Sequence, residues 1–145
     1  MAIRFYKVNE KFGCFSNFSK HGFQLDGKYW PTSEHYFQAQ KFVGTVYEEQ
    51  VRLAKTPKDA ANSGRDRKKP LRPDWEQVKD EIMKKAVLQK FQIHSDIRET
   101  LLSTAGEELI EQTTNDYYWG CGTNGTGKNM LGKILMEVRE LLHKA

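Results

Sequence analysis

The chain has 145 residues, 38% of them hydrophobic and 29% charged, and a formal net charge of +4. This length fits one domain with a single core, and no apolar run approaches the ~18 residues needed to cross a bilayer, so we expect no membrane partner. The modest positive charge favours anionic partners but does not separate a phosphorylated metabolite from nucleic acid.

The sequence predicts short strands near the N-terminus, followed by a series of helices. Glycines and polar residues break the β-type runs near the N-terminus, whereas later segments show helix caps and a 3.6-residue apolar period. In chain order we predict strands at 3–8 and 22–25, then helices at about 32–43, 45–54, 56–64, 74–91, 95–102 and 129–142. The fold class is therefore α+β, a compact single domain over residues 1–145 that is mostly helical with short N-terminal strands.

Several helix ends are predicted from particular residues. Thr56 and Pro57 form a cap and a first-turn proline for a short helix that ends at Gly64. Ser95 is the expected cap of the fifth helix. The last helix carries an apolar stripe that is typical of a core-facing surface: Leu131, Ile134, Leu135, Val138 and Leu142.

The N-terminus, cysteines and histidines exclude several classes of protein. MAIRFY has no apolar core followed by a cleavage site, so no signal peptide is visible and we expect a cytoplasmic protein. Cys14 and Cys121 lack the spacing of a metal pair and are expected to be reduced, buried thiols. The histidines show no metal spacing either, so neither a metal nor another cofactor is expected.

The first predicted helix is unusually polar for a segment surrounded by aromatic residues. Glu34, Gln38 and Lys41 fall at i, i+4 and i+7, which places them on one helix face. Flanking aromatic residues imply that this helix is largely buried, and Glu and Lys are rarely buried unless they are paired or used. A structural ion pair and a functional site both remain open.

The glycine-rich segment 120–129 resembles a phosphate loop without matching one. Gly122, Gly127 and Lys128 fit G-x-x-x-x-G-K, but Asn129 stands where Ser or Thr would hold magnesium. A nucleotide triphosphatase is therefore not expected. Free backbone N–H groups before a helix would still favour an anion, and a tight structural connection is the alternative.

Two further polar features could be structural or functional. The loop 64–72 concentrates five cations, which suits either a solvated surface or phosphate binding by arginine. Asp116 lies beside Trp119 in a turn-like segment before the glycine loop. Its carboxylate could close the turn or bind a sugar or base.

Taken together, ordered blocks from about residue 12 to 141 resemble the NADAR family of YbiA-like N-glycosidases. These blocks are FSNF at 15–18, the segment 26–42, GRDR at 64–67, DWEQVK at 74–79, NDYYWG at 115–120 and GKNMLG at 127–132. Members are compact single domains that act on N-glycosidic bonds to ribose.

The resemblance to the bacterial branch implies hydrolysis of early riboflavin-pathway intermediates. These small phosphorylated ribosylamines, the ribosylamino-pyrimidine 5′-phosphates, yield ribose 5-phosphate and an aminopyrimidine without a cofactor. One alternative, from another branch, is removal of ADP-ribose from guanine in nucleic acid. A second alternative is a non-catalytic module that binds ADP-ribose or a nucleotide. The oligomeric state does not follow from the sequence.

The resemblance also implies roles for individual residues. Glu34, Trp75 and Asp116 match proposed active-site positions, and Lys41 matches a lysine suspected of covalent catalysis in the ADP-ribosyl-removing branch. Lining of the substrate pocket is expected from Ser16, Asn17, Phe18, Arg65, Trp119, Gly120, Lys128 and Asn129.

The two roles proposed for Lys41 make opposite demands on its pKa. Burial would lower the pKa and give a nucleophilic amine, whereas an ion pair with Glu34 would raise it. Arg65 is expected to contact the substrate phosphate, assisted by the backbone amides of residues 125–128.

Overall fold

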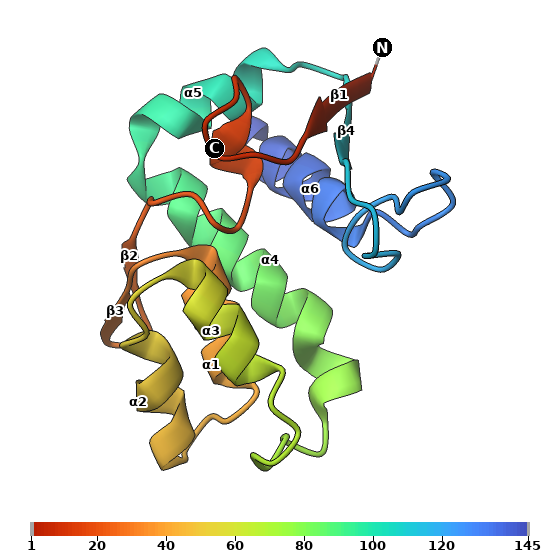
Figure 1. Ribbon diagram of the computed structural model, residues 1–145. Coiled ribbons are helices and arrows are strands. Elements are labelled where there is room, and N and C mark those ends of the chain that lie inside the picture. The colour runs from red at the N-terminus through yellow and green to blue at the C-terminus, as the bar shows by residue number, and fades with distance from the viewer. Residues whose placement is uncertain (1, 145) are drawn as a thin grey trace. The chain divides into compact units, whose positions relative to one another are not determined.

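In the computed structural model, which describes residues 2–144, the chain divides into two compact units (Figure 1). The first unit combines the described residues up to 19 with those from 91 onward, and the second comprises residues 20–90. Helix α4 (Trp75–Ile93) contributes residues to both units. The predicted α+β class, mostly helical with short strands, is confirmed. The single-domain boundary over 1–145 stays a prediction.

The second unit begins with a tight β-hairpin. Strand β2 (Phe23–Leu25) pairs antiparallel with β3 (Lys28–Trp30). Asp26 and Gly27 form the turn with φ of 53° and 78°. Positive φ at both central residues is the pattern of a type I′ turn, which suits the twist of a hairpin. The turn was expected from the sequence, whereas β3 was not.

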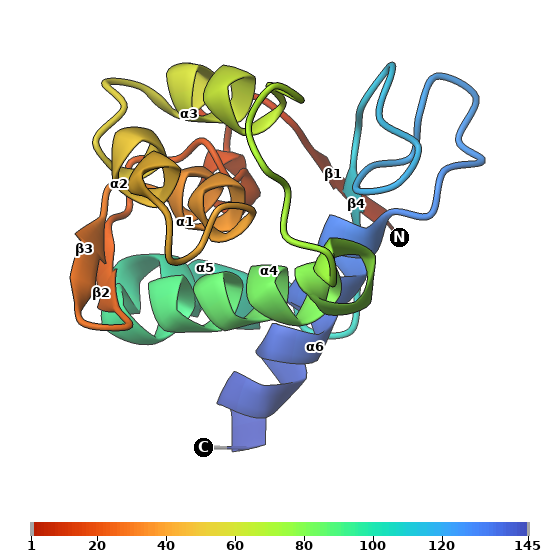
Figure 2. The same ribbon diagram turned by 90° about the horizontal axis from the view of Figure 1, so that it is seen from below.

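Three short helices follow the hairpin: α1 (Ser33–Gln40), α2 (Val46–Arg52) and α3 (Pro57–Gly64). Figure 2 shows them grouped beside the hairpin. A threonine hydroxyl caps each helix by accepting a backbone N–H of its first turn; the three caps are Thr32, Thr45 and Thr56. The predicted starts are confirmed. The first helix ends three residues earlier than expected.

The core of the second unit is built from the inward faces of the hairpin and these helices. Trp30 is fully buried, its Nε1–H donates to the Leu25 carbonyl at 2.9 Å, and its ring meets that of Tyr36 edge-on at 5.0 Å. Around these rings lie further buried side chains, namely Phe23, Ala39, Phe42, Val51, Ala60 and Ala86. Burying aromatic side chains on this scale is the main stabilising contribution to such a unit.

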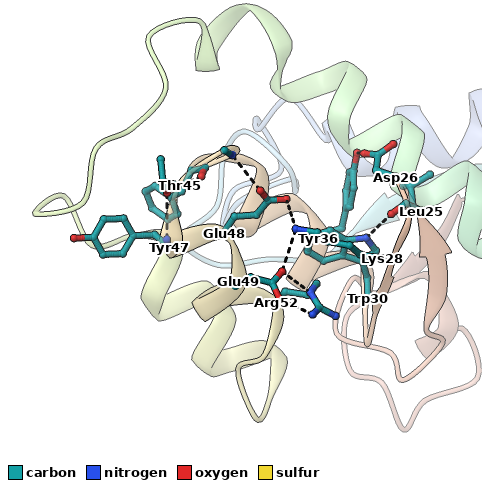
Figure 3. Close-up of polar contacts among 12 residues, drawn as sticks. Leu25, Asp26, Lys28, Trp30, Tyr36, Thr45, Tyr47, Glu48, Glu49 and Arg52 are labelled. Atoms are coloured by element: carbon teal, nitrogen blue, oxygen red, sulfur yellow. Dashed lines mark hydrogen bonds and ion pairs between the residues drawn. The ribbon is translucent and has the colours of Figure 1, made fainter.

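Polar contacts tie the hairpin to the neighbouring helices (Figure 3). The Tyr36 hydroxyl donates to Asp26 at 2.7 Å, and Lys85 on α4 pairs with the same carboxylate at 2.7 Å. Partial burial alone would raise the pKa of Asp26, but the hydrogen bonds from Lys85 and Tyr36 outweigh it and leave that pKa below its usual value. Asp26 thus shapes the turn and also anchors it.

A second group of charges joins the hairpin to α2. Lys28 Nζ lies 3.1 Å from the Glu49 carboxylate (Figure 3). The same carboxylate accepts hydrogen bonds from Arg52 Nε at 2.8 Å and from Arg52 Nη2 at 2.6 Å. These side chains are partly exposed, and solvent weakens their attraction, so they orient the two elements more than they stabilise them.

Helix α1 is buried along its whole length, although five of its eight residues are polar. His35 is satisfied inside the unit: its Nε2 lies 2.9 Å from the Ala54 carbonyl and its Nδ1 lies 2.8 Å from the Thr32 hydroxyl. A carbonyl only accepts, so Nε2 carries the hydrogen and Nδ1 accepts from the threonine. Burial lowers the pKa of His35, which agrees with this neutral form.

In the first unit, β1 (Ala2–Phe5) pairs parallel with β4 (Glu108–Glu111). The strand β4 was not predicted. Helix α5 (Ser95–Ser103) begins after His94 without a side-chain cap, so the prediction that Ser95 is its cap was wrong by one residue. The unit also contains a short 3₁₀ helix at Gly13–Phe15.

The last helix, α6 (Met130–Lys144), packs its apolar stripe as predicted. Four members of the stripe are buried and Leu142 is partly exposed. Both cysteines are free; Cys121 is buried as expected, whereas Cys14 is partly exposed. Within residues 2–144, no helix combines the length and apolarity needed to cross a membrane.

The capping of α1 should matter more than that of α3. In Thr32→Val, the helix loses its cap and His35 is left with an unpaired buried nitrogen, so the free energy of unfolding should fall by about 2–4 kcal/mol. Thr56→Val removes only an exposed cap and should cost about 1 kcal/mol. Urea unfolding at pH 7 measures both. Equal losses would show that the His35 contact contributes nothing.

Candidate active site

Four of the predicted site residues belong to the second unit. Glu34 lies in the first turn of α1, Lys41 immediately follows that helix, Arg65 follows α3, and Trp75 opens α4. Glu34, Lys41 and Trp75 are buried, whereas Arg65 is exposed.

Lys41 lies against two aromatic rings that pack on each other. Its Nζ is 5.7 Å from the ring centre of Trp75 and 5.9 Å from that of Phe37, and these two rings are 5.0 Å apart. Nζ also donates to the carbonyl of Gly64, the last residue of α3, at 3.3 Å. The structure therefore brings the lysine, Trp75 and the end of α3 together.

The electrostatic surroundings of Lys41 favour its neutral form. Burial, the largest cause, and repulsion by Arg67 together lower its pKa to about 8, against the attraction of Glu34. Within residues 2–144, no carboxylate oxygen lies within 4.0 Å of Nζ. With a pKa of about 8, roughly a tenth of the side chain is a neutral amine at pH 7. The sequence left open whether burial or an ion pair with Glu34 sets the pKa of Lys41. In the structure the effect of burial is the larger one.

Glu34 has a buried hydrogen-bond donor of its own. The Nε2 of Gln38, one turn further along α1, donates to Glu34 Oε2 at 2.7 Å. Gln38 was not among the predicted site residues, although its i+4 position on the face of Glu34 was visible in the sequence. Glu34 and Gln38 thus form a buried carboxylate–amide pair beside Lys41.

Cations surround this pair on the side of the basic loop. Arg65 and Lys79 both act to lower the pKa of Lys41, after the larger effects of burial and Arg67. The Arg67 guanidinium donates to the Gly64 carbonyl, while the Arg65 guanidinium makes no hydrogen bond or ion pair with the described residues. Arg65 is therefore available to an anionic ligand.

Most of the basic loop is folded back on its own unit. Arg72 pairs with Asp74 at 2.7 Å, and Lys69 donates to the Ser63 hydroxyl at 2.5 Å. Together with Arg67, three of the five cations are occupied in this way. The loop is thus neither a fully solvated surface nor an array of free cations.

The remaining predicted site residues belong to the first unit. Asp116 Oδ1 accepts the backbone N–H groups of Tyr118 at 3.0 Å and Trp119 at 2.8 Å, so the carboxylate does close a turn. Its Oδ2 has no hydrogen-bond partner among the described residues. One oxygen is structural and the other is available.

Other members of the predicted pocket in this unit differ in exposure. Ser16 and Asn17 are buried, Phe18 is exposed, and Trp119 is partly exposed with its ring 4.9 Å from that of Tyr118. Ser16 Oγ accepts the Phe18 N–H at 3.1 Å. Lys128 is exposed and its Nζ lies 5.4 Å from the Tyr118 ring centre, and Gly120 is buried against Thr113.

The backbone amides that lead into α6 are not free. Every N–H from 125 to 131 donates within the loop segment, to the Gly122, Cys121, Tyr117, Gly120, Tyr118 and Trp119 carbonyls and to the Asn124 side chain. The expectation that free amides there would bind a phosphate was therefore wrong. The loop is the tight structural connection that the sequence left as the alternative.

Asn129 explains how this connection is held. It adopts a left-handed backbone with φ of 54°, its Oδ1 accepts the Glu111 N–H at 2.9 Å, and its Nδ2 donates to the Leu109 carbonyl at 2.9 Å. Asparagine tolerates this conformation better than most residues. The side chain thereby joins β4 to the start of α6.

The comparisons with known proteins decide the family. The family model described as the NADAR domain matches residues 4–143. The chain belongs to the NADAR family. The resemblance seen in the sequence is therefore confirmed.

Characterised relatives within this family are close. N-glycosidase YbiA of Escherichia coli is 53% identical over 140 residues, which cover 97% of this chain and 88% of that protein. The chloroplastic riboflavin biosynthesis protein PYRR of Zea mays is 43% identical over 152 residues, covering 94% of this chain and 24% of that longer protein. The NMR structure of E. coli YbiA superposes with a TM-score of 0.91 at 52% identity, covering 99% of this chain and 85% of that one.

The role of Asn129 can be tested against its predicted role in substrate binding. Asn129→Ala should lower the free energy of unfolding by roughly 2–4 kcal/mol, because two buried backbone groups lose their partners. Asn115→Ala, at an exposed position of the same unit, should change it little. Urea unfolding gives both values. Unchanged stability combined with weaker ligand binding would instead assign Asn129 to the substrate.

Proposed function

We propose that this protein is an N-glycosidase that cleaves the bond between ribose and nitrogen in ribosylamino-pyrimidine 5′-phosphates of early riboflavin synthesis. The observation that carries the proposal is a buried lysine of lowered pKa beside a buried carboxylate, in a member of the NADAR family. Relatives named N-glycosidase and riboflavin biosynthesis protein support this substrate class. A cytoplasmic location is part of this proposal.

In the carboxylate route, Glu34 stabilises the transition state directly. Breaking the C1–N bond develops positive charge on the anomeric carbon, and an ionised carboxylate in a dry site opposes that charge strongly. Water adds its oxygen to C1, and one of its protons ends on the leaving nitrogen. The products are ribose 5-phosphate and the free aminopyrimidine. Asp116, whose Oδ1 closes a turn in the first unit, stays a predicted catalytic residue on the family resemblance alone.

In the covalent route, the neutral amine of Lys41 attacks C1. A bond forms between Nζ and C1, the C1–N bond to the pyrimidine amine breaks, and the proton lost by Lys41 goes to the leaving amine. Ring opening gives an imine, which water hydrolyses to ribose 5-phosphate and free lysine. The pKa of about 8 and the lack of a carboxylate within ion-pair distance support this route.

The 5′-phosphate needs a cationic partner, and Arg65 is our candidate. Its guanidinium is exposed, has no internal partner and lies close enough to influence Lys41. Arginine binds phosphate through paired, charge-assisted hydrogen bonds. Trp75, beside Lys41, offers an aromatic face for the sugar or the pyrimidine.

The alternative substrate, ADP-ribose on guanine in nucleic acid, depended on the basic loop. Three of the five cations there bind within the second unit, so the loop presents fewer free charges than the sequence suggests. A non-catalytic binding module is also less well supported, because it would not require a lysine of lowered pKa.

The substrate proposal is tested by incubating the purified protein with the two early ribosylamino-pyrimidine intermediates. Ribose 5-phosphate should be released, and Glu34→Gln should reduce its release by at least a hundredfold because the negative charge is lost. Chelator should make no difference. Release no faster than in the Glu34→Gln control would refute the substrate class.

The covalent route predicts a specific response at Lys41. Lys41→Arg retains a positive charge but loses the reactive amine, so kcat should fall by about three orders of magnitude. The wild-type rate should rise as pH increases through about 8, because deprotonation supplies the nucleophile. Borohydride added during turnover should trap a ribose adduct on Lys41. Substantial activity in Lys41→Arg without any adduct would leave the carboxylate route alone.

Arg65 should act mainly on substrate binding. Arg65→Ala removes a charge-assisted phosphate contact worth about 1.5–3 kcal/mol, so KM should rise roughly ten- to a hundredfold with little change in kcat. Lys68→Ala, which removes another exposed loop cation without an internal partner, is the matched control and should have a small effect. Equal effects of the two variants would indicate a diffuse electrostatic contribution instead.

A further inference from the structure

Gln38 is buried on α1 in an arrangement that costs free energy. Its Oε1 is inaccessible to solvent and has no hydrogen-bond partner among the described residues, while its Nε2 donates to Glu34 Oε2 at 2.7 Å. Buried acceptors without a partner are uncommon because their lost hydration is not replaced. An apolar side chain of the same size would avoid that cost. The arrangement therefore points to a function of the Nε2 contact.

The orientation of the amide follows from its partner. Turning the amide over would place Oε1 against Glu34 Oε2 across 2.7 Å, and two oxygens are held that close only if the carboxyl is protonated. With Nε2 facing it, the carboxylate can remain ionised, and a hydrogen bond from a donor favours that charged form.

Gly64 provides the space in which the amide is held. A Cβ at position 64 would lie 2.1 Å from Gln38 Oε1 and 2.8 Å from Gln38 Cβ, so any larger residue would displace the amide. The Gly64 carbonyl also accepts from Lys41 Nζ. One glycine at the end of α3 thus fits against Gln38 and holds the lysine.

From these contacts we propose that Gln38 is a positioning residue that holds Glu34 as an ionised carboxylate. Glu34 then works by opposing positive charge at the anomeric carbon or by activating water, and the proton on the leaving nitrogen comes from another group. The catalytic part of this inference rests on the proposed N-glycosidase function. The ionisation part concerns the protein alone.

The ionisation of Glu34 can be measured without turnover. In protein labelled with ¹³C at the glutamate carboxyls, the Glu34 signal is assigned by its loss in Glu34→Gln, and its titration midpoint is followed with pH. Gln38→Met keeps the side-chain volume but removes the donor, so the midpoint should rise by about one to two pH units. In Gln38→Asn the side chain is too short to reach Glu34, so the midpoint should rise as well. This second variant keeps the test valid if Gln38→Met does not fold.

The matched control is Gln40→Met on the same helix. Gln40 is also buried, but its side chain makes no hydrogen bond with the described residues, so the Glu34 midpoint should not move. The nearby charges that act on this site, Lys41, Arg65, Arg67 and Lys79, are the same in all three variants. An unchanged midpoint in both Gln38 variants would overturn the inference.

Activity then tests whether Gln38 acts through Glu34. Gln38→Met should lower kcat about ten- to a hundredfold, with KM changed less than about twofold. When it is combined with Glu34→Gln, kcat should be no lower than in Glu34→Gln alone. Additive losses would overturn the positioning role. An inactive wild type would refute the proposed function, while the titration would still decide the ionisation of Glu34.

Discussion

The burial of the polar helix α1 is the constraint on which the second unit depends. Eight consecutive residues, five of them polar, are removed from water, and a buried polar group without a partner inside the protein costs free energy. His35 does so through Thr32 and Ala54, and Glu34 does so in part through Gln38. These partners belong to the helix itself or to segments packed against it. The same desolvation that makes the partners necessary also lowers the pKa of Lys41.

The neighbouring elements are shaped to fit this helix. The Asp26-Gly27 turn orients a carboxylate toward the Tyr36 hydroxyl, and α3 ends in a glycine that lets α1 approach closely. The threonine caps start each helix at a defined residue, which fixes where the following side chains point. Structural residues and candidate site residues therefore alternate along one short helix. A change to either kind affects the other.

The sequence was most informative where local chemistry decides structure. Caps such as Thr56 with Pro57 predicted helix starts correctly. The capping hydroxyl accepts a backbone N–H only two or three residues further on, so the interaction can be recognised from neighbouring residues in the sequence. Strand β4 was missed, since it depends on pairing with β1 more than a hundred residues away. The apparent phosphate loop shows a related limit: its composition suggested free amides, but the folding of the loop on itself pairs them with carbonyls such as those of Tyr117 and Gly120. Glu34 and Lys41 could be named from the family pattern. Whether they form an ion pair depended on three-dimensional distances and burial.

The low basicity of Lys41 also makes it a target for covalent reagents. A lysine in water has a pKa near 10.4, so its neutral fraction at pH 7 is smaller than that of Lys41 by about two orders of magnitude. Electrophiles that react only with free amines, such as small aldehydes bearing a phosphate, would therefore modify this side chain ahead of the exposed ones. Its Nζ lies against the rings of Phe37 and Trp75 and the residue is only 8% exposed, so compact reagents should reach it more readily than bulky ones. Lys41 is thus a candidate for selective labelling and for inhibitors that mimic an open-chain sugar phosphate.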